Sequence, residues 1–600
     1  MPAKSLIKRS ALIVVALFLV SILIWAISFG LAYKSALDLR SSLKTDDALS
    51  LKANAEDLGK KFNYVDSISD WPTNALISKI PSPGCVLSDL RHTSHALGDL
   101  GSGILAASDE FFAVQEKYKT PIYADQKVNV EKLLALEVAF KSFNPYLQSG
   151  LSDVKKLSPN GFIFGKIGRP MTDIEKLGEA SKTLQNSYEN LGVLLGSKEK
   201  VHYLVTVGNQ AELRASGGAP LSIAVVSIAN GKIQIEEQGQ ISTEFFYGNP
   251  KVSWQHIMKK PFATSEDKAF KFVNSNIHPD FRIAGEEMMR SWEASGGVPV
   301  VGVIALDSTS ISNILSLTGP VQTLKFGEIN SDNFIQRMLI DSYRELSNEG
   351  ERQAVNDSLA AEIISRFFTL QPREILTFAM QNGDTRNLQI NLRDEYLQSV
   401  LEILELTGAG PAAFAKSGMD VVALYSKNRN QAKSDVFQIR YIDQTVNLTQ
   451  AGGAKVIRKT TIENRIPPGV TGEGIIGYTT LWSKNYWIQY IPESAENVSL
   501  VLPNGYEPWS IEYDSLGGKF VWTWGGWIEP NESVELLLTY DIPADTFPDQ
   551  KYEVLFAPQP IVSPVKLEIS VFDHTGKALT DTSAFADNRY KNATTIIHYE

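Results

Sequence analysis

The chain of 600 residues contains one cysteine, Cys85, and seven histidines. A single cysteine excludes an internal disulfide framework. The histidines are scattered, so we expect no dedicated zinc site. They lie at positions 92, 95, 202, 256, 278, 574 and 598. His92 and His95 are one helical turn apart and could present two ligands on one face of a helix. With no third ligand in the sequence nearby, a solvated helix surface explains this spacing better, and we expect no metal.

Basic charge is also scarce. The sequence has 57 Lys and Arg residues against 68 Asp and Glu residues, which gives a formal net charge of −11. A nucleic-acid-binding protein needs basic surface to neutralise phosphates, so we expect no nucleic-acid partner. The sequence also lacks a Walker A loop, an H-E-x-x-H motif and a G-x-S-x-G elbow, which leaves nucleotide and common hydrolase chemistry without support.

One long apolar run stands near the start of the chain. Residues 11–33 are uncharged for 23 positions, long enough to cross a hydrocarbon core of about 30 Å. The run exceeds the apolar part of a secretory signal, and no convincing cleavage site follows it. The short basic N-terminus favours a cytoplasmic start. The sequence therefore predicts a single-pass membrane protein, with residues 1–10 cytoplasmic, 11–33 as the transmembrane anchor and the rest outside the membrane.

The remaining chain changes character twice. Residues 34–198 place apolar side chains three and four apart between prolines such as Pro145, which predicts a helical bundle or stalk whose helices end at those prolines. Residues 199–430 alternate strand and helix patterns, which is typical of an α/β domain and includes the run MDVVALYS at 419–426. Residues 431–600 show short alternating strands, which predict a β-sandwich. The expected fold class is therefore multidomain α+β: a transmembrane helix, a helical stalk, a central α/β domain and a C-terminal β-sandwich.

Six of the ten tryptophans lie between Trp482 and Trp527, inside the predicted sandwich. Exposed indole rings could stack on sugar rings. Packing in the sandwich core and at its edges is the plainer interpretation of the same residues. A lectin-like module would need at least two exposed rings side by side.

The stretch from His202 to Gly231 is the most site-like feature of the sequence. Two short β-branched runs flank a polar turn that carries Asn209, Glu212 and Arg214, followed by Gly217-Gly218. Charged groups beside glycines, where a ligand can approach the backbone closely, predict a ligand-binding site formed by these five residues. An ordinary hairpin loop, with glycines needed only for positive φ, is an equally good interpretation.

The same stretch resembles the signature of the bacterial domain of unknown function 4012 family, which is close to L-x-x-x-Q-N-x-x-E-L-R-x-x-G-G-F followed by a strand and N-G-K. Gly208 and Ala219-Pro220 depart from that pattern. Further matches are residues 278–293, 301–321 and 427–435. The resemblance implies a cell-envelope protein whose activity is unknown. The residues that fall on the signature are Asn209, Glu212, Leu213, Arg214, Gly217, Gly218, Asn230, Gly231 and Lys232.

The order of strands, arginine-containing turn and N-G-K hairpin is also similar, more distantly, to the LytR-CpsA-Psr family. That resemblance implies a similar α/β fold and a phosphotransferase that moves glycopolymers from a polyprenyl-pyrophosphate carrier to the cell wall. Arg214 would contact the pyrophosphate, with Asp280, Arg282 or Asp307 nearby and magnesium as the cofactor. Ser216-Gly217-Gly218 stands where that family has an aspartate, which removes its best magnesium ligand. Asp307 ends a buried strand, and helix capping explains it better than ligand binding.

Two hypotheses follow. The favoured one is an envelope protein without a cofactor that binds a cell-wall glycopolymer, a lipid-linked sugar or a protein partner, and contacts the membrane through residues 11–33. The alternative is the phosphotransferase. The geometry of Arg214 separates them, because an enzyme needs Glu212, Arg214 and further charged residues to converge in a deep apolar pocket. If Arg214 instead forms a structural ion pair under the hairpin, the phosphotransferase hypothesis is disfavoured.

Overall fold

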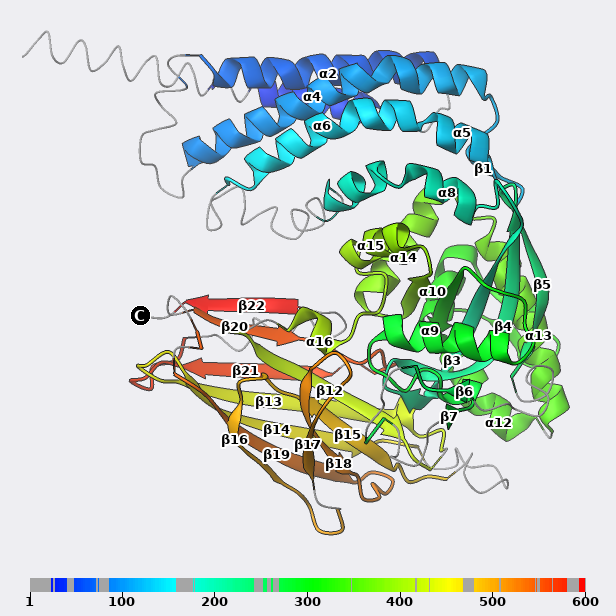
Figure 1. The fold of residues 1–600 in the computed structure, drawn as a ribbon, viewed down its shortest axis with the longest axis vertical. Coiled ribbons are helices and arrows are strands. Elements are labelled where there is room, and N and C mark those ends of the chain that lie inside the picture. The colour runs from blue at the N-terminus through cyan, green and yellow to red at the C-terminus, as the bar shows by residue number, and fades with distance from the viewer. Residues whose placement is uncertain are drawn as a thin grey trace, which may run out of the picture. The chain divides into compact units, whose positions relative to one another are not determined.

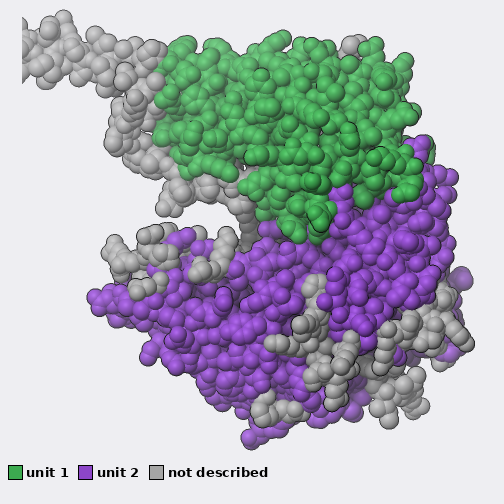
Figure 2. Space-filling view, in the orientation of Figure 1, with its two compact units in different colours: residues 1–199, 395–404 green, residues 200–394, 405–600 purple. Residues whose placement is uncertain are grey.

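We describe the protein from a computed structural model, in which the chain forms two compact units (Figure 2). Unit 1 comprises residues 1–199 and 395–404, and unit 2 comprises residues 200–394 and 405–600. The structure describes residues 23–41, 48–71, 74, 86–157, 176, 178–241, 252–255, 260–262, 269–415, 418–467, 480–579 and 593–598, apart from positions 25, 26, 40, 347, 431, 507, 508, 545, 548–550 and 564.

The predicted transmembrane helix is contradicted. No helix in the described parts of the chain combines the length and the apolar character that crossing a membrane requires. The predicted single-pass membrane localisation is therefore wrong, and so is the transmembrane helix in the predicted fold class. Most of the apolar run, residues 11–22, lies outside the described residues. Residues 27–39 are helical and contact the bundle, because Ser35 Oγ donates to Asp57 Oδ2 at 2.5 Å.

Unit 1 is mainly helical (Figure 1). Its long helices α2 and α4 pack closely at glycines, since a Cβ added to Gly101 would lie 2.6 Å from the carbonyl oxygen of Gly59. Pro145 was expected to end a helix but lies inside α6, where it interrupts the backbone ladder without stopping the helix. The elements are α2 (Ala48–Ser69), α4 (Val86–Lys117), β1 (Tyr123–Ala124), β2 (Lys127–Val128), α5 (Val130–Ala135), α6 (Glu137–Val154), α8 (Tyr188–Leu194) and α15 (Glu395–Ile403).

The first half of unit 2, residues 200–394 and 405–419, is called the α/β half below. Five of its strands form a sheet in the order β5-β4-β3-β8-β11, in which β3 pairs antiparallel with β4 and parallel with β8. The strands of this half are β3 (Val201–Arg214), β4 (Gly217–Ala229), β5 (Lys232–Gln240), β6 (Val252–Ser253), β7 (Ala269–Phe270), β8 (Gly302–Asp307), β9 (Val321–Thr323), β10 (Gly327–Ile329) and β11 (Leu388–Leu392).

Helices cover both faces of this sheet. Met288 and Trp292 of α9 pack with Leu204 on one face, whereas Ile311 and Leu315 of α10 join the core of the other face together with α13 and α14. The apolar periodicity of each helix matches the sheet face that it covers. The helices are η2 (Phe272–Asn274), α9 (Phe281–Ala294), α10 (Ser308–Thr318), α11 (Phe334–Gln336), the π-helical η3 (Arg337–Asp341), α12 (Ser342–Glu345), α13 (Glu349–Phe367), α14 (Pro372–Asp384) and α16 (Pro411–Phe414).

The second half of unit 2, residues 420–600, is called the sandwich half. It contains a six-stranded sheet in the order β17-β18-β15-β12-β20-β22 and a five-stranded sheet in the order β16-β19-β14-β13-β21 (Figure 1). One large apolar core contains side chains of both sheets. The elements are β12 (Asp420–Asn428), η4 (Asp435–Phe437), β13 (Gln438–Leu448), β14 (Ala454–Asn464), β15 (Asn485–Tyr490), β16 (Glu496–Val501), β17 (Ser510–Tyr513), β18 (Lys519–Trp524), β19 (Ser533–Ile542), β20 (Lys551–Phe556), β21 (Lys566–Phe572) and β22 (Ala593–His598).

Strand β12 differs from its sequence interpretation. The run at 419–426 was assigned to the α/β domain, yet β12 lies in the six-stranded sheet between β15 and β20. Val422 and Leu424 face the sandwich core, while Ala423 and Tyr425 face a second core that includes Ala215 and other residues of the α/β half. A strand buried on both faces is apolar throughout, and such a run looks the same in either kind of domain.

Candidate functional site

The tip of the β3–β4 hairpin is irregular, and its glycines serve the backbone. Asn209 pairs with Ala219 and Leu213 pairs with Gly218, so residues 210–212 bulge out of the ladder. A Cβ on Gly218 would lie 2.4 Å from the carbonyl carbon of Asn209, and Gly217 has φ of +139°. The glycines therefore allow the two strands to approach each other around the bulge.

The bulge sends three consecutive side chains in different directions. Gln210 Nε2 donates to Asp307 Oδ2 at 2.8 Å, and Ala211 is fully buried in an apolar cluster with Leu339. Glu212 lies against Lys433. One short segment thus contacts the start of α10, an apolar core and the sandwich half.

Glu212 is the centre of a buried ion cluster. Its Oε1 accepts a hydrogen bond from Arg214 Nη2 at 2.8 Å, and its Oε2 accepts one from Lys433 Nζ at 2.8 Å. Burial by itself would raise the pKa of the Glu212 carboxyl, but Lys433 and Arg214 outweigh burial and lower that pKa to about 2. Arg214 also donates to the carbonyl of Leu213 at 3.2 Å. The signature arginine is therefore bound to its own hairpin.

A second buried carboxylate, that of Asp435, also binds the hairpin tip. Asp435 Oδ2 accepts the backbone N–H of Leu213 at 2.8 Å, and Asp435 also accepts hydrogen bonds from Asn428, Gln438 and Asn485. Burial raises the pKa of the Asp435 carboxyl despite these donors. Nearby, Gln559 Nε2 donates to the carbonyl of Arg214 at 2.8 Å. The hairpin tip is thus bonded to two separate segments of the sandwich half, one that contains Lys433 and Asp435 and one that contains Gln559.

Asp307 acts as the N-cap of α10. Its Oδ1 accepts the backbone N–H of Ser310 at 2.9 Å in a reciprocal capping box, and its Oδ2 also accepts Asn387 Nδ2 at 2.6 Å. Burial raises the pKa of the Asp307 carboxyl to about 7, against the opposing effect of these donors. Capping therefore accounts for this residue.

Asp280 and Arg282 form a separate pair. Asp280 caps α9 and binds Arg282 through Nε at 2.9 Å and Nη2 at 2.7 Å, and it also accepts the backbone N–H of Gly410 at 2.9 Å. Burial would raise the pKa of the Asp280 carboxyl, but Arg282 keeps it below its usual value. Of the four predicted catalytic candidates, Arg214 bonds to Glu212, Asp307 to the start of α10, and Asp280 and Arg282 to each other.

The space beside the two glycines is small. A cavity of about 20 Å³ is lined by residues that include Gly217, Gly218, Asn276, Asp307 and Gln389. One water molecule needs about 10 to 15 Å³ by such a measure, so this cavity has room for one water and none for a pyrophosphate or an isoprenoid chain. The predicted ligand-binding residues are brought together here, but as parts of a packed junction.

Sequence reasoning missed the partners from the sandwich half. Lys433 and Asp435 bind the hairpin tip across more than 200 positions of sequence, and Gln559 binds it across 345. One signal was present, since the stretch KNRNQAKSD at 427–435, which was assigned from the sequence to the family resemblance, contains both Lys433 and Asp435.

These contacts define a protein in which an α/β half and a β-sandwich half are joined at a hairpin tip by buried polar bonds. A family model described as "Protein of unknown function (DUF4012)" matches residues 198–343, which include the whole hairpin. The predicted resemblance to that family is confirmed over these residues. No curated protein matches the sequence.

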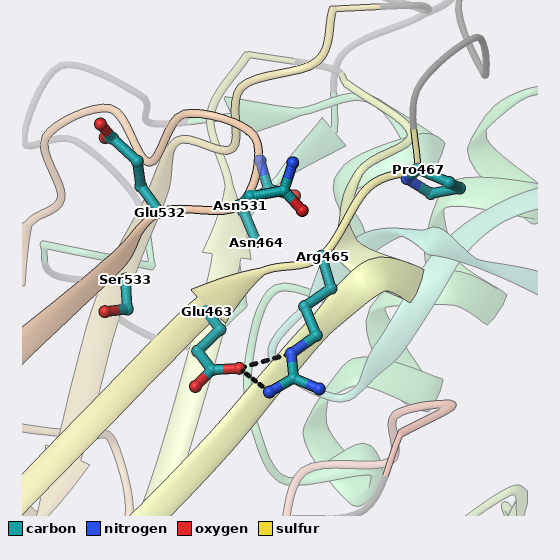
Figure 3. A pocket seen from close by; sticks show the side chains of 7 residues that line it. All are labelled: Glu463, Asn464, Arg465, Pro467, Asn531, Glu532 and Ser533. Carbon is teal, nitrogen blue, oxygen red and sulfur yellow. Dashed lines mark hydrogen bonds and ion pairs between the residues drawn. The ribbon is translucent and has the colours of Figure 1, made fainter.

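An open polar depression lies on the sandwich half. It measures about 570 Å³, and Figure 3 shows the ion pair between Glu463 and Arg465, two of the residues that line it. Asn464 Nδ2 donates to the carbonyls of Leu481 at 2.8 Å and Ile528 at 2.9 Å. The depression is lined by Glu463, Asn464, Arg465, Pro467, Asn531, Glu532 and Ser533.

The two residues that receive the Asn464 bonds adjoin tryptophans. Leu481 precedes Trp482, and Ile528 follows Trp527, whose residue surface is 50% exposed. The two indole rings lie 5.6 Å apart at 84°, and Lys484 Nζ is 4.3 Å from the centre of the Trp527 ring. A lectin-like module was expected to need at least two exposed rings side by side, whereas these rings are perpendicular and Trp482 is half-buried. Trp527 therefore offers one half-exposed indole, in the residue next to Ile528, whose carbonyl Asn464 of the depression contacts.

Proposed function

We propose that this protein is a non-enzymatic binding protein for an extended glycopolymer, held on the open surface of the sandwich half. The observation that carries this proposal is the Glu212 ion cluster. Arg214 and Lys433 are neutralised by one buried carboxylate, so the charges of the family signature serve the junction between the two halves. Ligand binding is then assigned to a different surface.

The depression of Figure 3 supports a hydroxyl-rich ligand. The exposed side chains of Arg465, Asn531 and Glu532 offer planar donors and acceptors that suit paired sugar hydroxyls, and the half-exposed indole of Trp527 gives an apolar face for a sugar ring. The depression is open, which suits a long polymer passing over the surface better than a small molecule enclosed on all sides.

The phosphotransferase resembling LytR-CpsA-Psr proteins is the weaker candidate. It needs Arg214 to contact a pyrophosphate, and Arg214 would first have to leave Glu212. That exchange would leave a buried glutamate paired with Lys433 alone, at a substantial cost in free energy. The space beside Gly217-Gly218 would also have to open far beyond one water.

Co-sedimentation of the full chain with insoluble bacterial cell-wall glycopolymer tests the proposal. We expect Trp527→Ala to lower the bound fraction at least threefold, because the exposed ring supplies the stacking face. Tyr513→Ala, which removes an equally accessible aromatic ring from β17, is the matched control and should change nothing. Equal binding by both variants, or no binding by the unmodified chain, would refute glycopolymer binding at this surface.

A further inference from the structure

A row of three side chains crosses the six-stranded sheet near its aromatic end. Lys427 of β12 lies directly opposite Tyr486 of β15, and Tyr486 lies directly opposite Trp524 of β18. Directly opposed residues point to the same face of a sheet, so the three side chains are neighbours. The rings of Tyr486 and Trp524 are 5.5 Å apart at 88°, in an edge-to-face contact.

Arg429, just after β12, lies on these two rings. Its guanidinium carbon is 3.9 Å from the centre of the Trp524 ring and 4.6 Å from that of Tyr486. The backbone of Arg429 is fixed as well, because its N–H donates to the carbonyl of Lys484 at 2.9 Å. The guanidinium is therefore held in place by stacking.

The stacked guanidinium has an unused donor. Arg429 Nη1 is buried and has no hydrogen-bond partner among the residues that the structure describes. The rings cannot satisfy it, because they cover the faces of the guanidinium, whereas its N–H groups point outward in its plane. A buried charged donor without an acceptor is unfavourable, and an oxyanion that meets the edge of the guanidinium would remove that penalty.

Two lysines strengthen the positive charge at this place. Lys260 Nζ lies 5.6 Å from the centre of the Trp524 ring, and Lys427 Nζ lies 5.8 Å from that of Tyr486. Within the described ranges, neither Arg429 nor Lys260 forms an ion pair. Lys484, whose ammonium lies over Trp527, links this cluster to the surface of the proposed function. This cluster of cations contrasts with the chain as a whole, which carries a net charge of −11.

We propose that Arg429, assisted by Lys260 and Lys427, forms an oxyanion site that takes the phosphate or carboxylate groups of an anionic glycopolymer. This inference rests on the proposed function and specifies its ligand as a charged polymer. A nucleic acid would offer phosphates too, but its bases need free ring faces for stacking, and the guanidinium of Arg429 covers a face of both Tyr486 and Trp524, the two rings at this site.

Isothermal titration of the full chain tests the inference. The probes are a glycerol phosphate polymer, polygalacturonate, neutral dextran, inorganic phosphate and a single-stranded oligonucleotide. We expect Arg429→Gln to weaken binding of both anionic glycopolymers about tenfold or more, because it removes a charge-assisted hydrogen bond. Rising salt should weaken binding of the unmodified chain. Arg366→Gln is the matched control, since Arg366 is a half-buried arginine that is already paired with Glu362.

Lys260→Gln is the second variant, chosen because Lys260 is exposed and its loss should leave the fold intact. It should weaken binding of the anionic polymers about threefold, a typical effect of one neighbouring surface charge. Equal affinity of every variant for the anionic polymers, or tighter binding of the oligonucleotide, would overturn the oxyanion site. If dextran binds as well as the charged polymers and Arg429→Gln changes neither, the inference fails while glycopolymer binding stands. If only inorganic phosphate binds, in an Arg429-dependent manner, the site stands and the proposed function fails.

Discussion

Lys433 Nζ donates to Glu212 Oε2 at 2.8 Å, across 221 positions of sequence. Both side chains are about nine-tenths buried, and Arg214 completes the cluster from the hairpin. This contact joins the tip of the β3–β4 hairpin to the segment that leads into β13. The family signature thus describes the junction of an α/β half with a β-sandwich half.

Removing Lys433 should destabilise that junction. We expect Lys433→Ala to lower the free energy of unfolding by about 3 kcal/mol, because it breaks a buried ion pair and leaves Glu212 with Arg214 alone. Urea denaturation followed by tryptophan fluorescence measures the change. Lys459→Ala removes a lysine from an exposed pair with Glu535 and should cost less than about 1 kcal/mol. Equal losses in the two variants would contradict a structural role for Lys433.

The Glu212 carboxylate should make the protein sensitive to acid. The pKa of this carboxyl is about 2 in the folded protein, whereas an unperturbed glutamate has a pKa of 4.5. The folded state therefore binds this proton less readily than the unfolded state, so the stabilisation is present above pH 4.5 and is lost as the pH falls toward 2. The full effect is about 3 kcal/mol. Thermal unfolding between pH 2 and 6 should show a shallower slope for Glu212→Gln, and identical slopes would contradict the assignment.

Asp307 should act in the opposite direction and in another pH range. Its pKa is raised from 3.8 to about 7, so the folded state binds this proton more readily than the unfolded state. Stability should therefore fall as the pH rises from about 4 to about 7, by about 4 kcal/mol at most. In Asp307→Asn this part of the pH dependence should disappear. Parallel unfolding profiles of the variant and the unmodified chain between pH 4 and 8 would contradict the raised pKa.

Local sequence patterns predicted those features that depend on neighbouring residues. Asp307 at the end of an apolar strand indicated a helix cap, which is what α10 shows, and the two short runs around residues 209–214 indicated a hairpin. Such features are set by backbone hydrogen bonding within a few residues, and the sequence displays them directly.

Long-range partners could not be predicted in this way. Nothing in the signature indicates that Glu212 contacts Lys433. Their proximity depends on the position of β12 in the six-stranded sheet, because Lys433 follows that strand. The apolar run of β12 fits either half, and only its neighbours in the sheet decide. The long apolar run at the start of the chain was likewise interpreted from its own length, lack of charge and flanking residues, and the described residues contradict that interpretation.

The glycine pair of the signature offers a separate test. Gly218→Ala places a Cβ 2.4 Å from the carbonyl carbon of Asn209, which forces the two strands apart at the bulge. We expect a loss of at least about 2 kcal/mol in the free energy of unfolding. Gly350→Ala, in helix α13, brings the new Cβ no closer than 3.4 Å to Asn348 Oδ1, an ordinary contact, and should be neutral or stabilising. If Gly218→Ala were as stable as Gly350→Ala, the glycines would have to be explained by a ligand instead.

The most direct measurement compares Lys433→Met with Trp527→Ala in glycopolymer binding, at a temperature at which both variants remain folded. We predict that Lys433→Met loses stability but keeps its affinity for the polymer, because the signature cluster joins the two halves. Trp527→Ala should keep its stability and lose affinity, because its ring lies on the binding surface. The reverse pattern, with affinity lost in Lys433→Met and retained in Trp527→Ala, would contradict the separation of the structural junction from the binding surface.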